Sequence, residues 1–154
     1  MRLALVFAAL AALCAPARAD VEVKIDKSSQ SMAVMIDGAQ MYSWAVSTGR
    51  GGGPRTGSYK PQRMGRKWFS RKYGMSPMPY AIFFHEGYAI HGTIYVSQLG
   101  QRASHGCVRL HPDNAATLFS LVQKHGMAST RIEIGAGVAA PKVRDGGRRL
   151  ASGE

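Results

Sequence analysis

Alternating hydrophobic and polar positions dominate the first part of the chain. One run covers residues 21–25 and a second covers 32–36, and in each the apolar side chains recur at every second residue. Asp37-Gly38, a dipeptide that favours a tight hairpin turn, precedes a third run at 39–47. The pattern predicts a three-stranded antiparallel meander that buries one of its faces.

A second group of strands is expected further along the chain. Residues 80–85 and 88–93 are apolar runs on either side of Glu86 and Gly87, which is typical of a β-hairpin. A short alternating run at 130–134 predicts a last strand. Together with the meander, these runs indicate a mostly β fold arranged as a sandwich or a barrel, with one main helix packed on it.

That helix is predicted over residues 111–126, the one segment with convincing helical periodicity. Asp113 is a candidate N-cap, and Gly126 is a candidate stop signal. The side chains expected on its apolar face are Leu118, Phe119, Leu121 and Val122. His111 and His125 are interpreted as residues at the helix boundaries without a chemical role.

The segment between the meander and the second hairpin is rich in glycine and proline. Residues 48–61 read TGRGGGPRTGSYKP and predict a loop, which we expect to continue irregularly through 75–79. A long ordered loop in a small domain often carries function. The Gly-Lys-Ser/Thr ending of a phosphate-binding loop is missing, which argues against that function.

The N-terminus has the features of an export signal. A basic residue is followed by an apolar run at 3–15 and by an Ala-Arg-Ala sequence that ends just before Asp20. The run is too short for a permanent membrane span. We expect residues 1–19 to be a cleaved signal that sends the chain to the periplasm, with a retained anchor as the alternative. A lipoprotein signal at Cys14 is disfavoured because Leu13 precedes it.

The rest of the chain divides into a domain and a tail. Residues 20–134 are long enough to form one domain with a sizeable core. Residues 135–154 are rich in Gly, Ala and Arg and contain little to bury, so we expect a disordered basic tail there.

The formal net charge of +11 is unevenly distributed. Between Gly38 and His85 there is no acidic residue, and aromatic residues are interleaved with the basic ones. The basic residues of this stretch are Arg50, Arg55, Lys60, Arg63, Arg66, Lys67, Arg71 and Lys72. In an exported protein they favour an acidic envelope polymer or an anionic lipid as partner and argue against nucleic acid. The structural alternative is a solvated basic loop.

Cysteine usage points to a single residue. Once the predicted signal is cleaved, Cys14 leaves with it and Cys107 has no intrachain partner. A lone cysteine in an exported protein indicates a reactive thiol or an intermolecular bridge, although buried inert cysteines are common. His91, His105 and His111 lie nearby in the sequence, but one thiol with this spacing fits no common zinc site. We therefore expect no metal.

A cysteine nucleophile accounts better for the same residues. A thiol needs an imidazole to take its proton, and His91 lies at the end of a predicted strand, where side chains are held reproducibly. The carbonyl of Gly92 can orient that imidazole. Gly106 permits a tight turn in which its amide and that of Cys107 point at a developing oxyanion. An imidazole and amides beside the sulfur also predict a depressed pKa for Cys107.

Two neighbouring residues leave alternatives open. His105 shares a face with Cys107 only if this stretch is extended, so we favour His105 as a site-shaping residue and His91 as the base. Arg109 can bind a substrate carboxylate through two parallel hydrogen bonds, or it can be a solvated or acid-paired surface residue.

Two motifs resemble a known family. The sequence IHGT at 90–93, followed by SHGCVRL at 104–110, resembles the signature of the L,D-transpeptidase catalytic domain of bacterial cell-wall enzymes. The segment AVSTGRGGGPRTGSYKP at 45–61 resembles the Ser-Thr-Gly … Thr-Pro-Thr-Gly-x-aromatic segment of that family. The resemblance covers approximately residues 21–134.

The resemblance implies a β-sandwich-like catalytic domain that uses no cofactor. It implies that Cys107 is the nucleophile, that His91 accepts and donates the proton, and that the Gly92 carbonyl orients His91. The residues that it places around the site or at its rim are Ser104, His105, Gly106 and Arg109.

The family's donor substrate is a peptidoglycan tetrapeptide stem. The thiolate attacks the carbonyl of the third residue, usually meso-diaminopimelate, and releases the terminal D-Ala. The acyl group then passes to an amine of a second stem or to a lysine of a wall-anchored lipoprotein, and carbapenems acylate the same cysteine. The implied partners are thus peptidoglycan stems and such a lipoprotein, with at most a peripheral association with the envelope.

The chain departs from the family pattern in its long loop. Arg55-Thr56-Gly57 stands where the family often has Pro-Thr-Gly, and residues 60–79 are candidates for an unusual lid. These departures leave the acceptor open. With water as acceptor, the protein would be an L,D-carboxypeptidase or a hydrolase, and a non-catalytic peptidoglycan-binding module is the third hypothesis.

Overall fold

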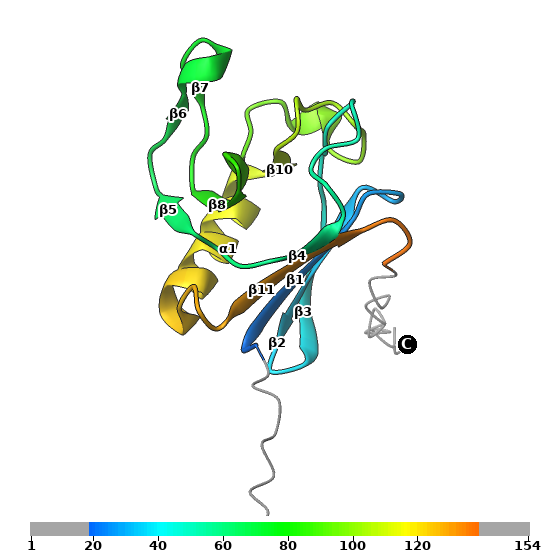
Figure 1. The fold of residues 1–154 in the computed structure, drawn as a ribbon, viewed down its shortest axis with the longest axis vertical. Helices are drawn as coiled ribbons and strands as arrows, with labels where there is room; N and C mark the ends of the chain where they lie inside the picture. Colours follow the sequence, from blue (N-terminus) through cyan, green and yellow to red (C-terminus); the bar gives the residue numbers. More distant parts are fainter. Residues whose placement is uncertain (1–18, 139–154) are drawn as a thin grey trace, which may run out of the picture.

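The computed structural model describes residues 19–138, which form two main β-sheets and one α-helix around a common core (Figure 1). The predicted signal, apart from Ala19, and the predicted tail beyond residue 138 lie outside the described residues. The last strand includes Gly135 and so extends one residue into the predicted tail. No helix in the described part of the chain has both the length and the apolar character needed to cross a bilayer.

The first sheet has five strands in the order β3-β2-β1-β11-β4. They are β1 (Val21–Asp26), β2 (Ser31–Ile36), β3 (Ala39–Ala45), β4 (Gly57–Tyr59) and β11 (Thr130–Gly135). The predicted meander of β1, β2 and β3 is confirmed, and Asp37 and Gly38 form its second turn with φ angles of 50° and 84°. The predicted C-terminal strand, β11, lies parallel to β1.

The expected alternation of exposure holds in β1 and β3 but not in β2. In β1 the outward-facing Glu22 and Lys24 are long enough to reach water between their neighbours. In β2 residues 32–35 are all buried, and the short Ala33 lies between Lys24 of β1 and Ser43 of β3.

The second sheet has four strands in the order β10-β9-β8-β5. They are β5 (Arg63–Gly65), β8 (Ala81–His85), β9 (Tyr88–Gly92) and β10 (Val108–Leu110). The predicted hairpin of β8 and β9 is confirmed, and Glu86 and Gly87 turn it with φ angles of 43° and 85°. β10 lies parallel to β9 and places Arg109 beside His91. An isolated bridge from Ser47 to Arg109 connects the two sheets, which do not close into a barrel.

Helix α1 (Pro112–His125) packs its apolar face on the core, as its periodicity predicts. Its buried residues are Ala115, Leu118, Phe119 and Val122, and Leu121 is partly buried. The predicted N-cap was wrong. Pro112 occupies the first helical position, which proline favours, and His111 is therefore the N-cap. The Nδ1 atom of His111 accepts a 3.3 Å hydrogen bond from the Asp113 amide, and Gly126 ends the helix as predicted.

The segment predicted as an irregular loop is partly ordered into short strands. Beyond β5 it forms a projecting hairpin, called the flap below and defined as residues 66–80 (Figure 1). The flap contains β6 (Phe69–Ser70), the 3-10 helix η1 (Arg71–Tyr73) and β7 (Ser76–Pro77). Backbone hydrogen bonds from Met78 to Trp68 and from Tyr80 to Arg66 close its base. Strands this short have no hydrophobic period for a sequence to reveal.

Candidate active site

The two faces of the second sheet carry different side chains. One face contributes to the main core with Ile82, Phe84, Ile90, Val108 and Leu110. On the opposite face, the strand registers align side chains in two rows across the sheet. The first row is Arg63, Phe83, Ala89 and, directly before β10, Cys107. The second row is Gly65, Ala81, His91 and Arg109.

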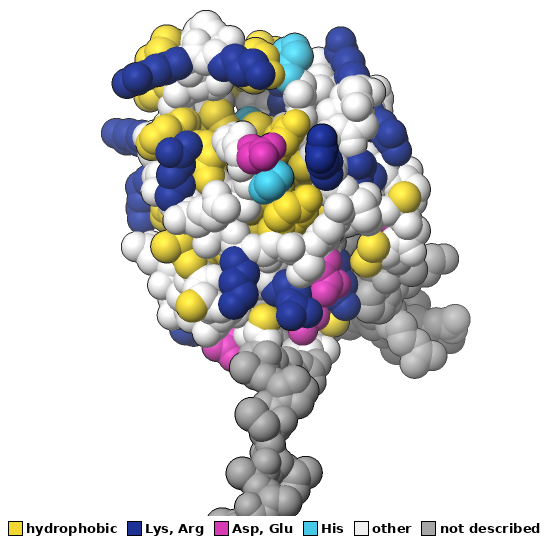
Figure 2. Space-filling view, viewed as in Figure 1, with side chains coloured by type: hydrophobic (Ala, Val, Ile, Leu, Met, Phe, Trp, Pro, Cys, Tyr) yellow, Lys and Arg dark blue, Asp and Glu magenta, His cyan; other side chains and the backbone are white. Residues whose placement is uncertain are grey.

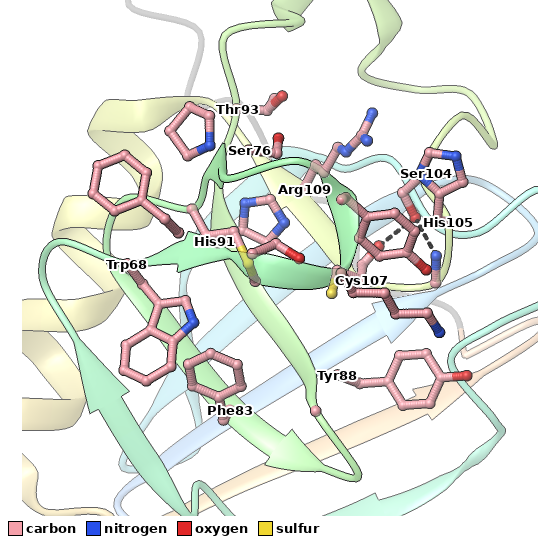
Figure 3. A pocket seen from close by; sticks show the side chains of 18 of the residues that line it. Trp68, Ser76, Phe83, Tyr88, His91, Thr93, Ser104, His105, Cys107 and Arg109 are labelled. Atoms are coloured by element: carbon pink, nitrogen blue, oxygen red, sulfur yellow. Dashed lines mark hydrogen bonds between the residues drawn. The ribbon is translucent and has the colours of Figure 1, made fainter.

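A cleft of about 1150 Å³ lies over this second face. His91, Cys107 and Arg109 all line it, and Figure 3 shows their side chains in the same hollow. The flap and the loop after β9 supply its other walls. The parallel pairing of β9 with β10 is what brings residues from separate parts of the sequence together here.

His91 is buried, with 7% of its surface exposed. Its Nδ1 atom lies 2.7 Å from the Gly92 carbonyl oxygen, as predicted from the sequence. Because a carbonyl only accepts hydrogen bonds, Nδ1 carries the proton and Nε2 is left to accept one. Burial lowers the pKa of His91 to about 4; the Gly92 hydrogen bond opposes this shift and the charge of Arg109 adds to it. The imidazole is therefore neutral near pH 7.

Cys107 is a half-buried free thiol. The apolar residues of the cluster against which it packs are Met78, Ala81, Phe83 and Ala89. Burial raises the pKa of the thiol, and it outweighs the Ala89 amide and the Arg109 charge, which both lower it. The prediction of a depressed pKa was wrong because the residues that desolvate the sulfur come from distant strands and from the flap. Thiol and imidazole are thus both neutral at rest.

Ser104 organises the turn that leads into Cys107. Its buried hydroxyl donates to the Cys107 carbonyl at 2.6 Å and accepts from the Gly106 amide at 3.0 Å. Its backbone bonds to Thr48 and Arg50 tie the turn to the glycine-rich loop. The expectation that the Gly106 amide serves an oxyanion is corrected, because that N–H is already bonded inside the turn. Of the two amides proposed, the Cys107 amide is the remaining candidate.

Gly106 occupies the tightest point of the turn. Its φ angle of +146° is one that residues with a side chain rarely adopt. A Cβ atom at this position would lie 2.5 Å from Cε1 of Tyr88. A Cβ on Gly49, in the adjoining loop, would likewise lie 2.9 Å from the Cα atom of Gly106. Gly49 therefore lets backbone pack against backbone, whereas Gly106 leaves room for the Tyr88 ring.

The structure separates the two histidines that the sequence offered as bases. His105 is exposed, and its ring stacks on Tyr73 of the flap with centroids 4.6 Å apart and planes 14° apart. His91 is buried and lines the cleft together with Cys107. This placement favours His91 as the base and gives His105 a shaping role at the contact between the turn and the flap.

Arg109 extends from β10 into the cleft without an acidic partner among residues 19–138. Its Nη1 donates to the side-chain oxygen of Gln98 at 3.3 Å, and its guanidinium lies 5.7 Å from the Tyr95 ring centroid. Of the two alternatives considered for Arg109, pairing with an internal acid is not what the structure shows. The residue is held at the rim, where a substrate anion can reach it.

Several cleft residues were not identified as site residues from the sequence. They include Arg63, Trp68, Phe83 and Tyr88, and the flap supplies many of the others. The interleaving of basic and aromatic residues between 59 and 73 was the available signal. It could not be assigned to the site because it lies far from the histidine and cysteine motifs in sequence.

The fold and the site together define a small two-sheet domain with a cysteine and a histidine in a basic cleft. The family model of the L,D-transpeptidase catalytic domain matches residues 20–135, and the chain belongs to this family. A search of curated protein sequences gave no match.

Solved structures share this fold. An L,D-transpeptidase from Stackebrandtia nassauensis is 25% identical, with a TM-score of 0.66 over 76% of this chain and 56% of that one. One from Mycobacterium smegmatis is 22% identical, with a TM-score of 0.65 over 76% and 59%. The LD transpeptidase LdtMt1, solved in complex with imipenem, is 24% identical, with a TM-score of 0.66 over 75% and 59%. The chain thus matches less than two thirds of the length of each.

Proposed function

We propose that the chain is a periplasmic cysteine acyltransferase that acts on peptidoglycan tetrapeptide stems. The observation that carries the proposal is the placement of Cys107 and His91 on one wall of the cleft, with Nδ1 of His91 held by Gly92. Membership of the L,D-transpeptidase family supports transfer of an acyl group as the reaction.

The neutral resting pair determines how the reaction starts. The thiol proton moves to Nε2 of His91 as the sulfur attacks the carbonyl carbon of stem residue 3. A sulfur–carbon bond forms, and the carbonyl oxygen gains a negative charge that the Cys107 amide is placed to stabilise. The carbon–nitrogen bond to the terminal D-Ala then breaks, and His91 gives the proton to the leaving amine.

The second half of the reaction regenerates the thiol. An acceptor amine loses a proton to His91 as it attacks the thioester carbon. The carbon–sulfur bond breaks and the thiolate regains a proton from His91. A new amide, the cross-link, is the product. Water in place of the amine would give a trimmed stem, which is the carboxypeptidase alternative.

The charge of the cleft supports an acidic substrate. Figure 2 shows Lys and Arg side chains spread over the upper part of the molecule, where the flap lies, while acidic ones are few on this face. The basic side chains that line the cleft are Arg50, Arg63, Lys67, Arg71, Lys72 and Arg109. Stem peptides carry several carboxylates, so their charge complements that of the cleft.

The test uses residues 20–154 and tetrapeptide muropeptides. We expect mass spectrometry to detect D-Ala release and dimer formation, and an intact-mass adduct after exposure to imipenem. Cys107→Ala should abolish all three, because no other group in the cleft replaces the sulfur. Cys107→Ser keeps the shape of the site but has a much weaker nucleophile, and it should also fail to turn over.

Each alternative gives a different outcome in the same assay. Trimmed monomers without dimers would indicate water as the acceptor. Modification of a lipoprotein lysine rather than a second stem would identify the attachment reaction. Salt-sensitive binding to sacculi that survives Cys107→Ala, with no release of D-Ala by the wild type, would indicate that the protein is a binding module and not an enzyme.

A further inference from the structure

Arg63 of β5 lies on the cleft face, at the opposite end of the row from Cys107. Its guanidinium carbon lies 4.1 Å from the centroid of the Phe83 ring and 4.9 Å from that of Trp68. These two rings meet edge to face with centroids 5.1 Å apart. The two rings form an aromatic corner that restricts the otherwise flexible side chain of Arg63.

The stacking leaves the hydrogen-bonding edge of this guanidinium available. Cation–π contacts use the flat surface of the group, whereas its N–H bonds point outward in the plane. Within residues 19–138, no carboxylate forms an ion pair with Arg63. The sequence contains no acidic residue between Gly38 and His85 that could do so locally. A planar two-point donor therefore lines the cleft without an internal acceptor.

The distance from this donor to the sulfur follows from the sheet. Because the guanidinium lies over Phe83 in β8, two strand spacings separate it from Cys107, which is about 10 Å. Phe83 and Ala89 fill the row between them and belong to the apolar cluster that Cys107 packs against. Figure 3 shows Trp68 and Phe83 close together, across the cleft from Ser104 and His105. The floor from cation to thiol is thus apolar.

We propose that Arg63 binds the carboxylate at the far end of the side chain of stem residue 3. This inference rests on the proposed function. With its carbonyl carbon at the sulfur, diaminopimelate would lay its methylene groups over Ala89 and Phe83 and reach the guanidinium edge with its terminal carboxylate. Arg63 is then a specificity-determining residue, which selects diaminopimelate over a residue of similar length that ends without a carboxylate.

The other arginine of this face is placed for a different group. Arg109 lies two residues beyond Cys107, directly beside His91, so it serves groups close to the attacked carbonyl. Its guanidinium is turned to Gln98 and Tyr95, away from the aromatic corner. The two arginines are therefore placed to bind substrate groups at different distances from the Cys107 sulfur.

The experiment compares two tetrapeptides that differ only at residue 3. One carries meso-diaminopimelate, and the other carries L-lysine, which keeps the methylene chain and the terminal amine but lacks the carboxylate. The measurement is kcat/KM for D-Ala release. We expect the wild type to prefer the diaminopimelate peptide by about 10-fold, the effect of one charge-assisted hydrogen-bonded pair at a partly exposed site. In Arg63→Gln the preference should fall to near parity, chiefly through a higher KM for the diaminopimelate peptide.

Two further variants control for charge and for folding. Arg66→Gln removes a nearby arginine, at the base of the flap, whose guanidinium lies 5.9 Å and 6.0 Å from the rings of Tyr80 and Phe119 and which does not line the cleft. The preference should persist in this variant. Arg63→Lys keeps the charge but loses the planar fork, and it should retain part of the preference. Melting temperatures of all variants test whether the sheet edge is intact.

The outcomes separate the two proposals. A wild type that releases D-Ala from both peptides equally well would overturn the role of Arg63 and leave the proposed function standing. Equal losses on both peptides in Arg63→Gln would also overturn it, since that is the result of a merely structural role. A loss of preference in Arg66→Gln would assign the effect to overall charge instead. Failure of the wild type to act on either peptide would remove both proposals.

Discussion

The turn before Cys107 and the flap border the same cleft but are built in opposite ways. In the turn, Ser104 and Gly106 are buried, and hydrogen bonds within the turn and to the glycine-rich loop fix the backbone. The flap exposes large side chains and, beyond its base, contacts the turn through the stacking of Tyr73 on His105. A fixed backbone suits groups that must meet a reacting atom, whereas exposed side chains suit recognition.

We expect the largest effect from a substitution that distorts the fixed turn before Cys107. Gly106→Ala adds a Cβ atom 2.5 Å from Cε1 of Tyr88, at a φ angle of +146°. Ring and turn must move apart, which displaces the sulfur. Because a shift of about 1 Å at a reacting atom can cost about 100-fold, we expect a loss of that size in the rate of acylation by imipenem. Intact-mass spectrometry against time measures this rate.

The flap offers a matched control for this substitution. Gly74 also has a positive φ angle, +60°, but a Cβ atom there would meet no other atom within 4 Å. Gly74→Ala therefore tests the conformational cost alone, about 1 kcal/mol for a left-handed residue with a side chain. Its acylation rate should stay close to that of the wild type. Similar losses in both variants would show that the turn is no more constrained than the flap.

The pH dependence of alkylation reports how the residues around Cys107 affect its thiol. Burial raises the pKa of Cys107, so less thiolate is present at neutral pH than in an unfolded chain. Alkylation by iodoacetamide should therefore inflect at a higher pH in the folded protein than in the same protein in denaturant. His91, with a pKa lowered to about 4, is neutral throughout this range and adds no charge that would favour the thiolate.

Denatured residues 20–154 are the proper reference because they contain the same single cysteine, Cys107, with full exposure. The position of the inflection reports the pKa, while the plateau at high pH reports access to the sulfur, so the two effects separate. An inflection at lower pH in the folded protein would mean that an ion pair exists before substrate binds. The neutral start of the proposed reaction would then have to be abandoned.

The sequence revealed the parts of the fold that depend on neighbours along the chain. The meander, the second hairpin and the helix follow from hydrophobic periods and from turn residues such as Asp37 and Gly38. Residues 60–79 were predicted as a candidate lid, but the strands of the flap were missed because they have two residues each, too few to show a period. The N-cap was misplaced by two residues because the preference of Pro112 for the first helical position outweighs that of Asp113 for the cap.

In the site, too, the sequence predicts local features but not those that depend on residues far apart in the chain. Cys107 and His91 could be chosen from the sequence because the chemistry of a thiol and an imidazole is local to each residue. Their pKa values could not, because burial depends on Phe83, Met78 and other residues that only the sheet and the flap bring near. Arg63 was likewise one basic residue among many until the register of β5 with β8 placed it on the row of Cys107. Long-range pairing therefore supplies what motifs cannot.

The smallest effect is expected from loosening the flap. Tyr73→Leu removes the ring that stacks on His105 but keeps an apolar side chain at a position that is already exposed. An aromatic pair contributes about 0.5–1.5 kcal/mol, so KM for the tetrapeptide should rise by about 2- to 10-fold while acylation by the small imipenem molecule changes less. Tyr73→Phe keeps the stack and should behave like the wild type. Equal slowing of imipenem and peptide by Tyr73→Leu would show that the flap also positions the sulfur, and the separation of chemistry from recognition would fail.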